Sequence, residues 1–140
     1  MGVLSQQVVD GQLRYSYASA GNARAVSVHL LRWESRWQMY EYVPAKHALR
    51  APVDASALGA VLPPPPSVAL LLRGDVGALD YEPAAKLDLL TQEIGFMKAV
   101  LDKSAKCFGW SWQLRSITAS QTSVDAILVL ASLPELRRML

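Results

Sequence analysis

The sequence has little of the chemistry that disulfide frameworks and metal centres require. Its 140 residues include one cysteine, Cys107, and two histidines, His29 and His47. A single cysteine excludes an intrachain disulfide and a cysteine-based zinc site. Two histidines so far apart in the sequence do not indicate a metal centre either. We therefore expect no bound metal.

An excess of charge of one sign is also lacking. The chain carries 14 basic and 12 acidic residues, a net charge of +2, and Arg137 and Arg138 are its only adjacent basic pair. Nucleic-acid-binding proteins gather positive charge on one face, because phosphate neutralisation supplies much of their affinity. The scattered charges here predict no nucleic-acid partner.

Long apolar runs suited to a membrane are missing as well. The longest uncharged run, residues 55–72, is interrupted by four prolines at 63–66, which break a helix. The first residues do not follow the pattern of a signal peptide. We expect a cytoplasmic protein without a membrane span. The proline tract is either a ligand for an SH3-type domain or, more typically for a tract that joins two apolar segments, a rigid spacer.

Apolar residues are abundant, at 51% of the chain against 19% charged residues. This balance predicts a single folded domain over residues 1–140 with a real core, and excludes a solvated disordered chain. The surplus of apolar side chains also indicates a surface buried by a partner. The four tryptophans fit either a core or an interface.

Four segments have the pattern of strands. Residues 26–30 and 37–43 alternate apolar and polar side chains, which predicts an antiparallel hairpin. Residues 67–73 and 124–131 are continuous apolar runs, typical of strands covered on both faces. Between the hairpin and the proline tract, Asp54 is the expected N-cap of a short helix.

The longest predicted helix covers residues 84–108. Pro83 suits its first turn and Gly109 the position after its end. One apolar stripe runs along it, formed by Leu87, Leu90, Ile94, Met97, Leu101 and Phe108. Gly95 interrupts this pattern at a cost of about 1 kcal/mol relative to alanine, which suggests a close approach by a second helix or a flat ligand. The expected fold is α+β: an antiparallel sheet of about four strands packed on a long central helix, with short helices at the ends.

Common catalytic motifs are absent. The chain has no phosphate-binding loop, no nucleophile elbow and no zinc-binding helix motif. Residues 17–22, however, form a run of small side chains just before the first strand, including Ser19, Gly21 and Asn22. Such residues let backbone amides and a hydroxyl approach the edge of a planar ligand, although the same residues also form plain turns.

This run and its context resemble a family pattern. Residues 14–30 look like the flavin-binding turn and first strand of the nitroreductase-like flavoproteins, which commonly carry a Pro-Ser-Ala-Gly motif there. Within that superfamily the chain resembles the azoline dehydrogenases of thiazole- and oxazole-containing peptides, including the streptolysin type. Their second strand, of the form Tyr-x-Tyr-x-Pro-x-x-His-x-Leu, reads here as residues 40–49. Other segments agree in order, so that the resemblance covers about residues 12–135: 69–75, 93–96, 108–110 and 124–130.

The resemblance implies a dimerising, nitroreductase-like fold with FMN between two chains. Ser19, Gly21 and Asn22 would then contact the flavin. Tyr81 would be the counterpart of a tyrosine implicated in removing a proton from the azoline ring, with His29 or His47 as a weaker candidate.

Several family features are missing. Set against the family, residues 1–140 are expected to form a single domain without the usual N-terminal helix that holds the flavin phosphate and without the C-terminal arm of many relatives. Ala18 replaces the proline of the turn, Asp80 stands beside Tyr81 where the family has a lysine, and Phe96 replaces a histidine. The dianionic phosphate would need basic groups, so FMN is expected to be shared with a longer nitroreductase-like partner in a homo- or hetero-oligomer.

Two functions follow from the resemblance. The chain is either a subunit of an FMN-dependent oxidoreductase that acts on a peptide azoline or a similar biosynthetic intermediate, or a non-catalytic, degenerate subunit that scaffolds a full-length flavoenzyme. A relative in fold alone, with another binding role, is a third reading. A peptide azoline, a carrier-bound intermediate and a small nitro or quinone compound all remain open as substrates.

Overall fold

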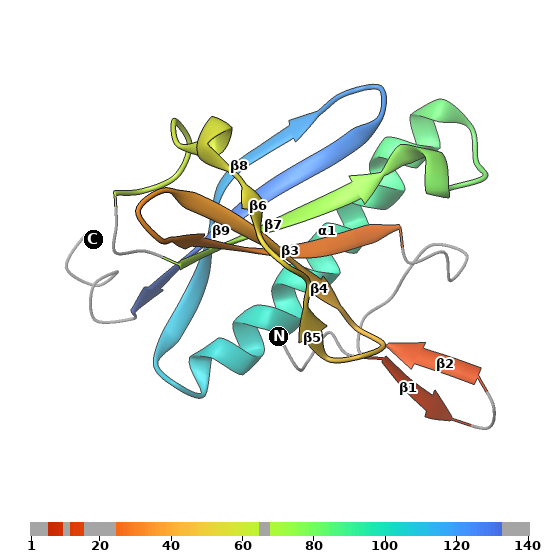
Figure 1. Cartoon of the computed structure of the whole chain (residues 1–140). Coiled ribbons are helices and arrows are strands. Elements are labelled where there is room, and N and C mark those ends of the chain that lie inside the picture. The colour runs from red at the N-terminus through yellow and green to blue at the C-terminus, as the bar shows by residue number, and fades with distance from the viewer. Residues whose placement is uncertain (1–5, 10–11, 16–24, 65–67, 133–140) are drawn as a thin grey trace.

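The computed structural model describes residues 6–9, 12–15, 25–64 and 68–132. Two strands near the N-terminus, β1 (Gln6–Val9) and β2 (Gln12–Tyr15), pair only with each other. A sheet of seven strands forms the body of the domain (Figure 1): β3 (Val26–Trp33), β4 (Trp37–Val43), β5 (Ala48–Leu49), β6 (Val53–Asp54), β7 (Val68–Asp75), β8 (Trp110–Ala119) and β9 (Ser123–Ser132). The expected sheet of about four strands is therefore wrong, although the α+β class holds.

The order of strands along the sheet is β5-β4-β3-β7-β9-β8, with β6 paired to β4, and each of these pairings is antiparallel. The predicted hairpin is confirmed as β3 and β4, with Trp33 opposite Trp37 at its closed end. Both continuous apolar runs are confirmed as the central strands β7 and β9. They carry no alternation because their apolar residues are buried on both faces of the sheet, Leu70 and Leu72 in one apolar cluster and Leu71 and Ile127 in the other.

Three strands of the sheet escaped prediction. β5 and β6 are two residues long each, too short for any alternation to show. β8 is long, but its register shifts between Leu114 and Ser116, where Arg115 forms a bulge. A bulge inserts one extra residue, so the apolar period of two changes phase within the strand. Because of that change, the sequence of β8 lacks the continuous alternation that predicts a strand.

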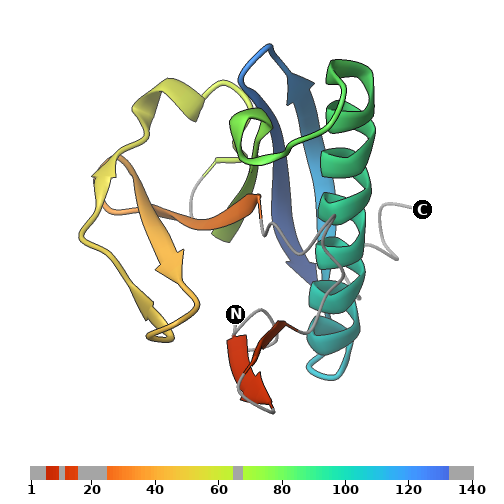
Figure 2. The same ribbon diagram turned by 90° about the vertical axis from the view of Figure 1, so that its right-hand side faces the viewer.

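The helix α1 (Pro83–Lys106) lies on one side of the sheet (Figure 2) and is not a central helix. It begins with the predicted proline, and Gly109 follows its end with a φ of 79°. Its inward residues are Leu90, Glu93, Ile94, Met97 and Leu101. Leu87 and Phe108, expected in the buried stripe, are 38% and 78% exposed, because each lies near an end of α1 where the helix leaves the sheet.

No short α-helices occur at the ends of the described chain. The segments that come closest are two turns of 3-10 helix, η3 (Ser56–Leu58) and η4 (Val76–Ala78). Asp54 belongs to β6, and its carboxylate accepts hydrogen bonds from the amide and the hydroxyl of Ser56. The prediction of Asp54 as an N-cap is therefore wrong, since Ala55 holds that position and makes no side-chain cap hydrogen bond.

Two apolar clusters fill the two sides of the sheet. The larger lies under α1 and includes Val28, Leu70, Leu72, Ala126 and Leu128. The smaller lies on the opposite face, where the segment with η3 covers one half of the sheet, and includes Leu31, Trp37, Leu62, Leu71 and Ile127. The other half of that face is free of this segment and is polar.

Candidate functional site

Polar side chains gather on the half of the sheet that neither α1 nor the η3 segment covers. Ser27 on β3, Arg73 on β7 and Asp125 on β9 stand directly opposite one another in register. Each follows or precedes a buried apolar residue, so the alternation of the strands turns all three away from α1. Together with His29, which lies two residues after Ser27 on the same face, they form what we call the polar cluster.

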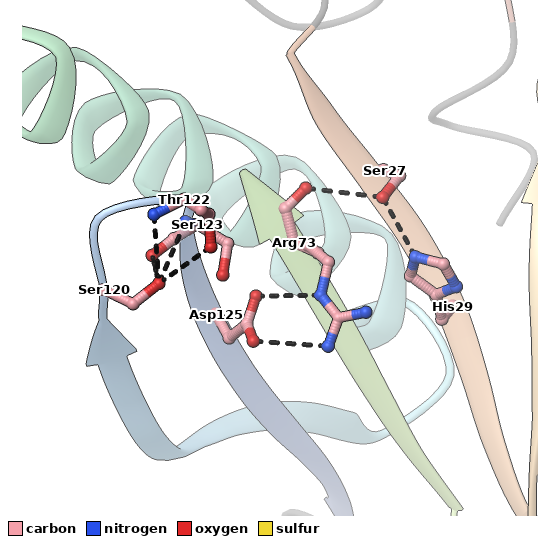
Figure 3. Close-up of polar contacts among 7 residues, drawn as sticks. All are labelled: Ser27, His29, Arg73, Ser120, Thr122, Ser123 and Asp125. Atoms are coloured by element: carbon pink, nitrogen blue, oxygen red, sulfur yellow. Dashed lines mark hydrogen bonds and ion pairs between the residues drawn. The ribbon is translucent and has the colours of Figure 1, made fainter. Parts of the chain in front are cut away.

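Hydrogen bonds connect the four members of the polar cluster (Figure 3). The Ser27 hydroxyl lies 2.9 Å from His29 Nε2 and donates to the backbone carbonyl of Arg73 at 3.3 Å. The Arg73 guanidinium donates from Nε and Nη2 to the two oxygens of Asp125, at 3.1 and 3.3 Å. Such a forked pair fixes the plane of the guanidinium.

A cavity of about 450 Å³ opens beside the cluster and is lined by Ser27, Arg73, Asp75, Thr122 and Ser123. Strand ends meet here, since the Asp75 amide donates to the carbonyl of Ala25 and the Val76 amide to that of Thr122. The Asp75 carboxylate also accepts from the amide of Gly77. One carboxylate, one guanidinium and three hydroxyls thus border this polar cavity, and the Asp125 carboxylate is bound to Arg73 beside it.

His29 is the buried titratable group of the cluster, with 9% of its surface exposed. Its Nδ1 is buried and has no hydrogen-bond partner among the described residues. Burial lowers the pKa of His29, an effect that the nearby charges of Glu41 and Asp125 oppose and that of Arg73 reinforces. The imidazole is therefore neutral near pH 7, and a neutral imidazole can accept a proton.

The predicted site residues are only partly brought together. Ser19, Gly21 and Asn22 lie outside the described residues. Tyr81 lies between η4 and α1, is 46% exposed, and is not among the residues that line the polar cavity. His47 lies in the turn after β4, where its Nδ1 is 2.8 Å from the hydroxyl of Tyr42.

Of these candidates, the polar cluster contains His29. Sequence reasoning missed Arg73 and Asp125 as a pair, because they are 52 positions apart. The available signal was a charged residue at the C-terminal end of one apolar run, Arg73, and another near the N-terminal end of the second, Asp125. The two residues lie opposite each other because of the register in which β7 pairs with β9, and a local sequence pattern does not show that register.

The described residues do not fit the phosphate end of FMN. Arg73 is the cation at the polar cavity, and two of its nitrogens are already bound by Asp125. Asp75 and Asp125 add negative charge, which opposes a dianion. Within the described part of the chain, no group of three or more histidine, cysteine, aspartate or glutamate side chains could hold a metal ion.

Comparisons with known proteins place the fold. No family model matches the sequence, and no curated protein matches it. Among solved structures, the chain is similar to a chain of the E. coli microcin synthetase McbBCD complex with truncated pro-MccB17 bound, with a TM-score of 0.69 and 17% identity. The match covers 93% of this chain and 60% of that chain. The likeness shows a common fold, and this chain spans about 60% of its neighbour's length. None of the helices in the described residues could cross a membrane.

Proposed function

We propose that this chain is one subunit of a multi-chain enzyme of natural-product biosynthesis, which oxidises a peptide azoline or a similar intermediate with FMN. The observation that carries the proposal is the fold shared, over 93% of the chain, with a chain of a synthetase complex. The resemblance of residues 14–30 and 40–49 to azoline dehydrogenases supports the oxidoreductase class.

The charged residues at the polar cavity support the proposal that FMN is shared between this chain and a partner chain. Since Arg73 is already bound by Asp125, the phosphate of FMN is assigned to a longer partner chain. Ser19, Gly21 and Asn22 are proposed to contact the polar edge of the flavin ring from this chain. Tyr81, exposed and adjacent to the start of α1, remains the proposed proton-transfer residue.

The test is the flavin content of the native complex, purified from its host through an affinity tag on this chain. Each neutral hydrogen bond contributes about 1 kcal/mol, so the double variant Ser19→Ala, Asn22→Ala should retain FMN at least about tenfold more weakly. Lys46→Ala, in the exposed turn after β4, is the matched control. Unchanged FMN retention in the double variant would refute a flavin contact by this chain.

A non-catalytic subunit is the second candidate, favoured by the neutralised Arg73 and by the position of Tyr81 away from the polar cavity. The two candidates differ in turnover. Tyr81→Phe should abolish oxidation by the complex if this chain supplies the proton-transfer group. It should leave turnover unchanged if the chain only supports a catalytic partner.

The oligomeric state is tested at Gly95. Apart from its chain neighbours and the backbone of α1, no described residue lies within 4 Å of a Cβ built there, so this face of α1 has room for a neighbouring chain. If a partner packs against that face, Gly95→Leu should lower the mass of the complex in light scattering and leave helix content intact. A complex of unchanged size would remove Gly95 from the interface.

A further inference from the structure

Among the described strands, β8 ends the sheet, and one side of its backbone faces away from β9. The amide of Trp112 shows which groups point outward, because it donates to the Asp102 carboxylate of α1 at 2.7 Å instead of to β9. In an antiparallel pair, backbone groups point alternately toward the partner strand and away from it. Residues of β8 that lie opposite every second residue of β9, counted from the partner of Trp112, therefore also point their amides outward.

Three further residues have that phase. Trp112 lies opposite Leu130 and Leu114 opposite Leu128. Beyond the bulge the same parity on β9 continues with Ile117 and Ala119, opposite Ala126 and Val124. Their amides and carbonyls therefore point to the free edge. An unpaired row of this kind is a template for another strand.

The side chains of these residues make the edge apolar on its helix side. Leu114 is 50% exposed and Ile117 46% exposed, although their partners on β9 belong to the core. At the end of the edge, next to Ala119, lies an apolar cavity of about 540 Å³ with Pro83 and Leu87 in its wall. An added strand would set alternate side chains beside Leu114, Ile117 and this cavity.

The charge of Arg115 favours an added strand that carries an acidic residue. Arg115 is exposed at the bulge, near the middle of β8, and has no ion pair within the described residues. Antiparallel pairing of β8 with a second copy of itself would bring two Arg115 side chains together, which is unfavourable. A carboxylate opposite Arg115 would be favoured.

From these observations we infer that β8 binds an extended segment of another polypeptide by strand addition. That segment carries apolar side chains at alternate positions, facing Leu114, Ile117 and the apolar cavity, and an acidic residue opposite Arg115. This is the β-augmentation mode of peptide recognition, in which backbone bonds supply affinity and alternate side chains supply specificity. The inference does not depend on flavin binding.

The experiment titrates the full chain with a fluorescein-labelled ten-residue peptide of alternating valine and threonine with one central glutamate. Ile117→Pro removes an outward amide and no bond to β9, a change that edge strands tolerate. It should weaken binding at least about tenfold. Thr118→Ala, whose backbone faces β9, is the matched control and should bind as the unmodified chain does.

Reversing the charge of Arg115 gives a second test, which does not require that the Ile117→Pro variant folds. Arg115→Glu should prefer a peptide with central lysine over the glutamate peptide, reversing the order seen with the unmodified chain. Hydrogen exchange at the amides of Leu114 and Ile117 should slow on binding. Equal binding by Ile117→Pro, an unchanged charge preference, or self-association through β8 without peptide binding would each overturn the inference.

Discussion

Arg73 and Asp125 face each other from the central strands β7 and β9 and form a forked ion pair, with Nε–Oδ1 and Nη2–Oδ2 distances of 3.1 and 3.3 Å. The carbonyl of Arg73 also accepts the hydroxyl of Ser27 on β3. A single residue thus ties together three neighbouring strands on the polar half of the sheet.

Breaking this fork should cost a modest part of the stability. Asp125→Asn is expected to lower the free energy of unfolding by about 1 kcal/mol, because the pair is forked but its side chains are 42% and 25% exposed. Urea denaturation measures the loss. The control Arg50→Gln breaks a more exposed pair, with Glu41, and should change stability by less than about 0.5 kcal/mol. Equal losses would show that the fork adds nothing.

His29 should make stability depend on pH. Its pKa is lowered in the folded state by burial, so below the unfolded value of about 6.5 the unfolded chain binds a proton that the folded chain does not. The free energy of unfolding should therefore fall as pH drops from 7.5 to 5. His29→Gln, denatured in urea across that range, should show a smaller fall. An equal fall in both proteins would assign the effect to other groups.

Two glycines should respond oppositely to alanine. A Cβ at Gly74 would lie 3.0 Å from a methyl group of Leu90, which is fully buried, so Gly74→Ala should destabilise the fold by about 1–3 kcal/mol. Gly95 has open space and lies within α1, so Gly95→Ala should stabilise the isolated chain by about 1 kcal/mol. Thermal unfolding monitored by circular dichroism distinguishes the two. Shifts in the same direction would contradict the packing described.

Asp102 should anchor α1 to β8. Its carboxylate accepts the amide of Trp112 at 2.7 Å and binds the Lys98 ammonium at 2.6 Å. Asp102→Ala is expected to cost about 1–3 kcal/mol, the range for a polar group left without its partner. Hydrogen exchange at the Trp112 amide should accelerate accordingly. Asp88→Ala, on the exposed face of the same helix, is the control and should leave that amide unchanged.

Much of the fold could be predicted from local patterns. Alternation in β3 and β4 revealed the hairpin, continuous apolar runs revealed β7 and β9, and Pro83 and Gly109 delimited the helix to within two residues of its bounds. The strand β8 was missed because the bulge at Arg115 shifts its apolar phase. The position of the helix on one side of the sheet was also missed. An apolar stripe indicates that one face of a helix is buried, but it does not indicate which element covers that face.

The sequence by itself determined which residues alternate and where the helix begins, because both depend on neighbours within a few positions. Only the tertiary structure decided that Ser27, His29, Arg73 and Asp125 share one polar face and that β8 is an edge strand among the described residues. Those relationships depend on strand order and register, which arise when segments up to 98 positions apart, such as Ser27 and Asp125, pair through the strand between them. Since a shift of register by one residue turns every side chain of a strand to the other face, no local pattern could place them.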